Sequence, residues 1–182
     1  MRWLASMKAQ NKRIAILVED LYQVLEVWYP QLRLKENDIN VVFVGTGSKQ
    51  TYGSKEGYPV KADLSIDQVK AKDFDGVIIP GGFAPDFLRR YPLMVDFVRQ
   101  LDKQGKVVAS ICHGGWMLVS AGILKGRKAT SFFAIKDDLV AAGADFVDAE
   151  VVVDQNLITS RKPEDLTAFV VEIIKVLKKQ KV

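Results

Sequence analysis

The chain has 182 residues, of which 48% are hydrophobic and 26% charged, and its formal net charge is +4. This composition is typical of one globular domain and excludes a disordered chain. A single cysteine and a single histidine exclude an intrachain disulfide and a zinc cluster built from those residue types, so we expect neither a metal nor a cofactor.

Charge and hydropathy patterns exclude two classes of partner. Basic residues alternate with acidic ones except near the C-terminus, and no basic stripe is interleaved with aromatic residues, as a nucleic-acid groove requires. No apolar run approaches the roughly 18 residues of a membrane span, and the opening stretch is too short for a signal peptide. We therefore expect a cytoplasmic protein, with residues 1–11 as a loosely ordered lead-in and residues 12–182 as one domain.

Four short apolar runs rich in β-branched residues predict strands. They lie at residues 13–18, 40–44, 75–79 and 106–111. Apolar side chains on both faces of a strand are typical of a parallel sheet that helices cover on both sides. Between these strands the pattern predicts helices after residue 20, after residue 92 and from residue 116 to 121, and it predicts a loop or short hairpin at residues 50–60.

The C-terminal third predicts a hairpin and a helix. Residues 150–159 indicate two strands joined by a tight turn at 154–156. Pro163 suits the first turn of a final helix, whose apolar stripe runs from Leu166 to Leu177. The order of elements predicts an α/β fold, a doubly wound sandwich with a mainly parallel central sheet. Ligand sites in such sheets lie beyond the carboxyl ends of the strands.

Cys112 is the first candidate for chemistry. It ends the fourth apolar run and is followed by a histidine and two glycines that open a helix, which is the pattern of a nucleophile elbow. The helix N-terminus is expected to lower the pKa of the thiol and so to favour the reactive thiolate. The alternative is an inert cysteine that packs as a small apolar side chain.

Three neighbouring groups are candidates for assisting this thiol. His113 is the only histidine; its main-chain N–H is well placed for an oxyanion hole, although its ring directly follows the nucleophile and is awkward for pairing with it. Gly81 and Gly82, after the third strand, can supply a second oxyanion donor. The alternatives are a surface histidine and a plain Pro-Gly-Gly turn.

Glu26 lies in an apolar stretch of the first helix, near the edge of the sheet where ligands bind. Burial would raise the pKa of this carboxyl, and the protonated form can donate a hydrogen bond to a thiolate. The alternative is a glutamate on the helix surface. Glu19 and Asp20 precede the helix and are equally consistent with capping it.

Six segments in order resemble the PfpI intracellular-peptidase family, in the superfamily that also holds the Parkinson-associated redox protein and class I glutamine amidotransferases. The segments are residues 80–85, 108–114, 126–128, 136–138, 148–154 and 159–161. The resemblance implies a flavodoxin-like α/β sandwich that forms a homodimer or a hexamer of dimers. It also implies Cys112 as the nucleophile and Glu26 as the buried glutamate that touches its sulfur.

The resemblance further implies a third catalytic residue, which a neighbouring subunit would contribute to His113. Here this position is Asp86, one methylene shorter than the usual glutamate. Phe132 stands where the peptidase-like branch has a tyrosine, and Gly115 and the bulky Trp116 follow the elbow in place of a proline. We assign Trp116 and Phe132 to substrate binding.

Two functions follow from these assignments. The first is an enzyme in which Cys112 attacks a carbonyl carbon, acting on small reactive aldehydes as a glutathione-independent glyoxalase or deglycase, or on peptides as an intracellular cysteine peptidase. Loss of the tyrosine hydroxyl favours aldehyde over peptide substrates. The second is a non-enzymatic redox sensor or chaperone in which Cys112 oxidises to a sulfinic acid, and which needs Glu26 but neither His113 nor Asp86.

Overall fold

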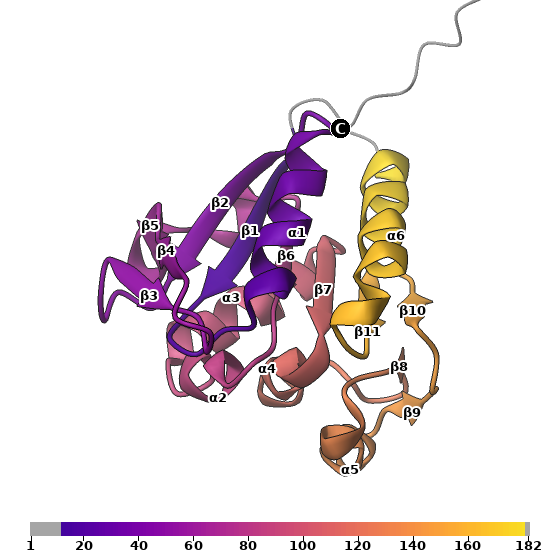
Figure 1. Cartoon of the computed structure of the whole chain (residues 1–182). Coiled ribbons are helices and arrows are strands. Elements are labelled where there is room, and N and C mark those ends of the chain that lie inside the picture. Colours follow the sequence, from indigo (N-terminus) through magenta and orange to yellow (C-terminus); the bar gives the residue numbers. More distant parts are fainter. Residues whose placement is uncertain (1–11, 181–182) are drawn as a thin grey trace, which may run out of the picture.

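The computed structural model describes residues 12–180, so the expected lead-in at 1–11 lies outside the described residues. A seven-stranded sheet forms the centre of the molecule, in the order β10-β11-β7-β6-β1-β2-β5 (Figure 1). All neighbouring strands are parallel except β10 and β11, which form the C-terminal hairpin. The strands are β1 (Arg13–Val18), β2 (Asn40–Gly45), β5 (Leu64–Ser65), β6 (Gly76–Ile79), β7 (Val107–Ile111), β10 (Val151–Asp154) and β11 (Leu157–Ser160).

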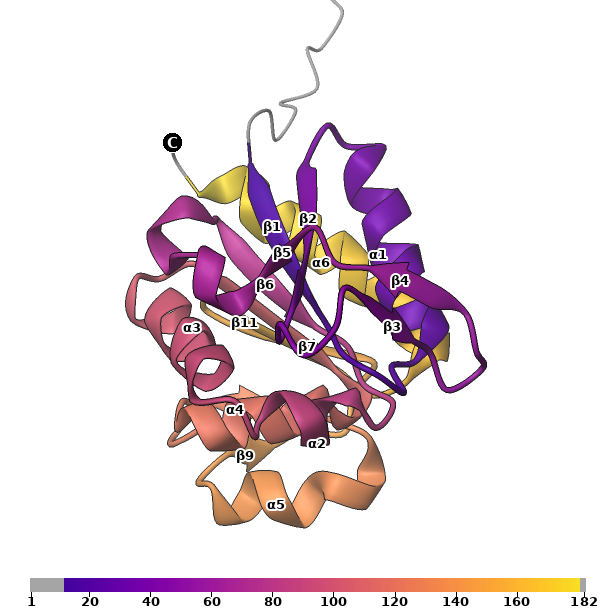
Figure 2. The same cartoon turned by 90° about the vertical axis from the view of Figure 1, so that its left-hand side faces the viewer.

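Helices cover both faces of this sheet. Strand β1 shows why, because its side chains alternate between two buried clusters: Ile14 and Ile16 pack with α1 (Val24–Lys35) and α6 (Leu166–Lys179), whereas Ala15 and Leu17 pack with α3 (Pro92–Lys103) and α4 (Gly115–Ala121). The two pairs of helices lie on opposite sides of the strands (Figure 2). The predicted doubly wound, flavodoxin-like sandwich is confirmed.

Smaller elements complete the chain. The expected hairpin at residues 50–60 is present as β3 (Thr51–Gly53) and β4 (Pro59–Lys61). Elements that the sequence pattern missed are short: the edge strand β5, α2 (Ala84–Leu88), α5 (Lys136–Ala141) and the parallel pair β8 (Lys128–Ala129) and β9 (Asp145–Phe146). Single turns of 3₁₀-helix are η1 (Ile66–Gln68), η2 (Ala71–Asp73), η3 (Cys112–Gly114), η4 (Phe133–Ile135) and η5 (Pro163–Asp165).

The first helix begins later than its apolar pattern suggests. Leu21 has φ 61°, and Tyr22 forms isolated bridges with Ser54 and Gly82, so the chain makes a turn before α1 starts at Val24. This turn holds the segments that follow β1, β3 and β6 beside one another. No helix within residues 12–180 combines the length and the apolar character needed to cross a membrane.

Candidate active site

Cys112 lies at a sharp turn between strand and helix, as the sequence predicts. It directly follows β7, opens η3 and has φ 59°, a left-handed conformation that is unfavourable for a side chain larger than glycine. The turn is tightly packed: a Cβ on Gly114 would lie 2.5 Å from the carbonyl oxygen of Ile79. Strain at an elbow of this kind lifts the nucleophile above the sheet edge.

Glu26 extends from α1 to the base of this elbow. The side chain is fully buried, and Oε2 accepts a hydrogen bond of 2.6 Å from the N–H of Gly81. Oε1 is buried without a hydrogen-bond partner among the described residues, and the Cys112 thiol is the neighbouring polar group that interacts with this carboxyl. Burial raises the pKa of Glu26 to about 7, which confirms the direction expected from the sequence.

The pKa of Cys112 differs from the expectation. Burial and the ionised form of Glu26 raise the pKa of the thiol to about 12, although N–H groups of His113 and Gly82 act in the opposite direction. The predicted lowering by the helix N-terminus is therefore wrong for the thiol beside an ionised Glu26. A helix dipole contributes about 0.3–1 kcal/mol at most positions, which is too little to offset burial and a like charge.

The His113 ring lies closer to the thiol than its sequence position suggests. Nδ1 is 3.3 Å from Sγ of Cys112, because the left-handed turn folds the two adjacent side chains toward each other. The ring packs between Trp116 and Phe132, with ring centroids 5.1 Å away in each case. Burial lowers the pKa of His113, so the imidazole is neutral at neutral pH and can accept a proton.

Gly81 and Gly82 have different tasks. A Cβ on Gly81 would lie 2.7 Å from Cβ of Cys112 and 2.8 Å from Oε2 of Glu26, so only glycine fits between the two side chains. Its N–H already donates to Glu26, which contradicts the expectation that it is free for an oxyanion. The N–H of Gly82 points to the sulfur and is the donor that remains from this turn.

Asp86 is not joined to His113 by a hydrogen bond within the described chain. It lies in α2, where its carboxylate pairs with Arg90 one turn later. The structure therefore brings together Cys112, Glu26 and His113 with both glycines, Trp116 and Phe132, but leaves Asp86 apart. The sequence analysis missed Lys55, whose charge acts on both Glu26 and His113 from the β3–β4 hairpin, because nothing in a loop sequence indicates where its tip folds.

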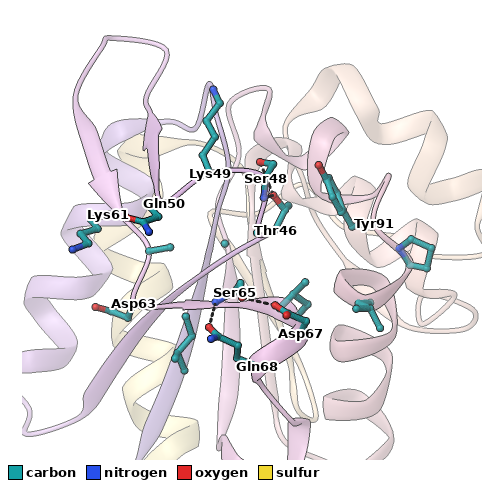
Figure 3. A pocket seen from close by; sticks show the side chains of 17 residues that line it. Thr46, Ser48, Lys49, Gln50, Lys61, Asp63, Ser65, Asp67, Gln68 and Tyr91 are labelled. Atoms are coloured by element: carbon teal, nitrogen blue, oxygen red, sulfur yellow. Dashed lines mark hydrogen bonds between the residues drawn. The ribbon is translucent and has the colours of Figure 1, made fainter.

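A pocket lies elsewhere on the same sheet edge. It measures about 830 Å³, is bordered by Thr46, Lys49, Lys61, Gln68 and Tyr91 among others, and contains none of the candidate residues around Cys112 (Figure 3). Its side chains are mostly polar and bind one another or the backbone, as in the hydrogen bond from Ser65 to Gln68. No group of three or more His, Cys, Asp or Glu within residues 12–180 is arranged to hold a metal ion.

Known proteins share this arrangement of elements. Residues 12–176 match the DJ-1/PfpI family. Deglycase PH1704 of Pyrococcus horikoshii is 44% identical over 166 residues, covering 91% of this chain and 99% of the relative. General stress protein 18 of Bacillus subtilis is 40% identical over 171 residues, covering 93% and 99%.

A solved structure agrees with these two sequences. A two-domain protein from Anabaena variabilis, with DJ-1/ThiJ/PfpI-like and ferritin-like domains, superposes with a TM-score of 0.89 at 42% identity. The match covers 91% of this chain and 50% of that chain. With the family match spanning almost all described residues, the chain belongs to the DJ-1/PfpI family.

Proposed function

We propose that this protein is a cysteine-dependent stress-response enzyme that converts small reactive aldehydes, or their early adducts on amines and thiols, into hydroxy acids. The observation that carries the proposal is the contact of one strained thiol with both a buried carboxyl and a neutral imidazole. Two relatives support it by name, since one is called a deglycase and the other a general stress protein.

Glu26 activates the thiol by holding a proton. With a pKa of about 7 it is protonated in half of the molecules near neutral pH, and a protonated carboxyl removes the like charge that opposes the thiolate. A proton that moves from Sγ of Cys112 to Glu26 leaves the net charge of the pair unchanged. The thiolate then keeps its N–H donors from His113 and Gly82.

The thiolate attacks the aldehyde carbon of a dicarbonyl such as methylglyoxal, which forms a carbon–sulfur bond and places negative charge on the former aldehyde oxygen. N–H groups beside the sulfur stabilise this oxygen. Neutral His113 moves the proton from the carbon of the hemithioacetal to the adjacent carbonyl carbon. The resulting thioester is hydrolysed by water, which releases lactate and restores the thiol without an oxidant or a reductant.

Two features favour aldehydes over peptides. Phe132 packs against His113 without a hydroxyl, so it cannot donate a hydrogen bond to the reacting group. Asp86 is engaged by Arg90 of its own chain and would have to exchange this partner to orient His113 of a neighbouring subunit in an oligomer. Peptide hydrolysis needs efficient protonation of a leaving amine, whereas addition to a free aldehyde expels no leaving group.

A redox role is the second candidate, and Glu26 favours it. The buried Oε1 without a partner can donate, when protonated, to an oxygen of an oxidised Cys112. This role requires neither His113 nor Asp86. Mass spectrometry after mild peroxide treatment tests it: we expect Cys112 to gain two oxygens, and a thiol that reacts with alkylating reagent but gains no oxygen would contradict the role.

Loss of methylglyoxal in the absence of glutathione tests the enzymatic proposal. We expect turnover by the wild type, none by Cys112→Ser, and a loss of about 100-fold or more in His113→Ala, as is typical of removing a proton-transfer group. Asp86→Ala should lose less than about threefold, because Asp86 pairs with Arg90 and has no hydrogen bond to His113 within the described chain. The absence of wild-type turnover would refute the aldehyde reaction, and equal rates for the wild type and His113→Ala would refute the role of His113.

A further inference from the structure

A smaller pocket of about 450 Å³ adjoins the active site. We call it the Arg161 pocket; its lining consists of Ser131, Phe132, Phe133, Lys136, Phe146, Asp148, Arg161 and Lys162. Three of the six sequence segments that carry the family resemblance meet here, through Lys136, Asp148 and Arg161. Neither the reaction proposed above nor the packing of the core uses this combination of residues.

Phe132 forms a wall that the pocket shares with the active site. Its ring centroid is 5.1 Å from that of His113 and 4.6 Å from that of Phe133, and its N–H donates to the carbonyl oxygen of Cys112 at 3.3 Å. The pocket therefore lies next to the active site across the Phe132 ring, and neither Cys112 nor His113 lines it.

The charge of the pocket is positive and only partly neutralised. Arg161 pairs with Asp148 at 2.8 Å and with Asp165 at 2.9 Å. Lys136 places its ammonium 5.5 Å above the ring of Phe146, and Lys162 has no ion pair within residues 12–180. Three cations are thus balanced by two carboxylates, of which Asp148 is mostly exposed and can leave Arg161 at little cost.

The walls suit a ligand that has an apolar stem. Phe133 lines the pocket and is 78% exposed, so its ring is available to a ligand. Aromatic faces beside cations bind an extended chain along its apolar part while the cations bind its charged end. A short chain ending in an anion matches both properties of the pocket.

We propose that the Arg161 pocket binds a carboxylate or phosphate group of the substrate, so that the enzyme prefers aldehyde adducts of molecules that carry an acidic group to neutral adducts. This inference rests on the proposed function for the reaction at Cys112, but it concerns binding alone.

The test uses unreactive lactoyl amides in matched pairs, measured by calorimetry on the full-length wild type. The first pair is N-lactoylglycine and its neutral amide; the second is N-lactoyl-phosphoethanolamine and N-lactoylethanolamine. We expect the anionic member of at least one pair to bind about tenfold more tightly, as expected for hydrogen bonds to a charged group, and the preference to fall with added salt. The pair that shows the larger preference distinguishes carboxylate from phosphate.

Lys162→Gln should reduce this preference to about threefold or less without changing the neutral ligands, because the side chain has no ion pair to lose. Lys70→Gln, at an exposed position outside the pocket, is the matched control and should behave as the wild type. Equal affinities within both pairs, a preference that survives Lys162→Gln, or no binding of any of the four ligands would overturn the inference. Failure of the proposed function is separate, because it appears as absent methylglyoxal turnover.

Discussion

Two buried glutamates at the same edge of the sheet differ in the number of hydrogen bonds that they accept. Glu19, at the end of β1, is 4% exposed and accepts hydrogen bonds from the N–H of Asp20 at 2.9 Å, from the hydroxyl of Ser48 at 3.3 Å and from the hydroxyl of Thr46. Glu26, seven residues later, is fully buried and accepts one, from Gly81.

The difference separates a structural carboxylate from a reactive one. A buried carboxyl group with several donors has its oxygens satisfied and holds its loop in place. Glu26 has one donor and one oxygen without a partner among the described residues, so burial raises its pKa. The carboxyl can therefore exchange a proton with Cys112. A pocket of about 830 Å³ is bordered by Thr46 and Ser48, which donate to Glu19, and not by Cys112 or Glu26, so cavity volume does not identify the reactive carboxyl.

The largest effect is expected from Gly81→Ala. The new Cβ would lie within 3 Å of Cys112, Glu26 and the N–H of His113, so the turn must shift and separate the thiol from its partners. We expect methylglyoxal turnover to fall by about 100-fold or more, since displacement of reacting groups by 1 Å is already costly. Gly53→Ala in the β3 hairpin, where a Cβ meets nothing within 4 Å, is the matched control, and an equal loss there would contradict the prediction.

Glu26→Gln and Glu19→Gln test directly whether the two glutamates differ in their effect on Cys112. In the wild type Glu26 loses its proton near pH 7 and its charge then opposes the thiolate, so alkylation of Cys112 by iodoacetamide should speed up with pH below that value and level off above it. Glu26→Gln keeps this position neutral, so the pKa of the thiol should fall and its alkylation at pH 7.5 should rise by about fourfold. Glu19→Gln should leave the rate unchanged.

The same two substitutions should change the free energy of unfolding in opposite directions. The unfolded chain ionises Glu26 at its ordinary pKa and the folded chain only near 7, so the free energy of unfolding of the wild type falls as the pH rises between these values. Glu26→Gln removes this loss and should be more stable than the wild type at pH 8 by about 2 kcal/mol. Glu19→Gln weakens its hydrogen bonds and should cost about 1–3 kcal/mol in chemical denaturation. Glu26→Gln less stable than the wild type at pH 8 would refute the assignment.

The smallest effect is expected from Phe132→Tyr, which adds one hydrogen-bond donor beside His113. The hydroxyl can hydrogen-bond the reacting oxygen, and we expect peptide or amide hydrolysis to rise by about threefold while methylglyoxal turnover changes by less than twofold. The ratio of the two kcat/KM values is the measurement. A larger gain for the aldehyde would indicate that the hydroxyl serves a step common to both reactions.

Hydrophobic periodicity identified most of the fold. The parallel strands β1, β2, β6 and β7, the hairpin at residues 50–60 and the final helix follow the predicted segments closely, because each buries a regular apolar face. The short elements α2, α5, β5, β8 and β9 were missed, since two to six residues are too few to show a period. The start of α1 was misplaced because Tyr22 pairs with distant segments.

The sequence by itself determined the position of Cys112 at the elbow and the apolar surroundings of Glu26, because both follow from local order along the chain. Only the tertiary structure decided the charge states and the partners. Which N–H reaches Glu26 depends on segments far apart in sequence, and how near the His113 ring lies to Sγ depends on an unusual φ at Cys112. A pKa responds to burial and to distances of a few ångströms, and these quantities exist only once the chain has folded.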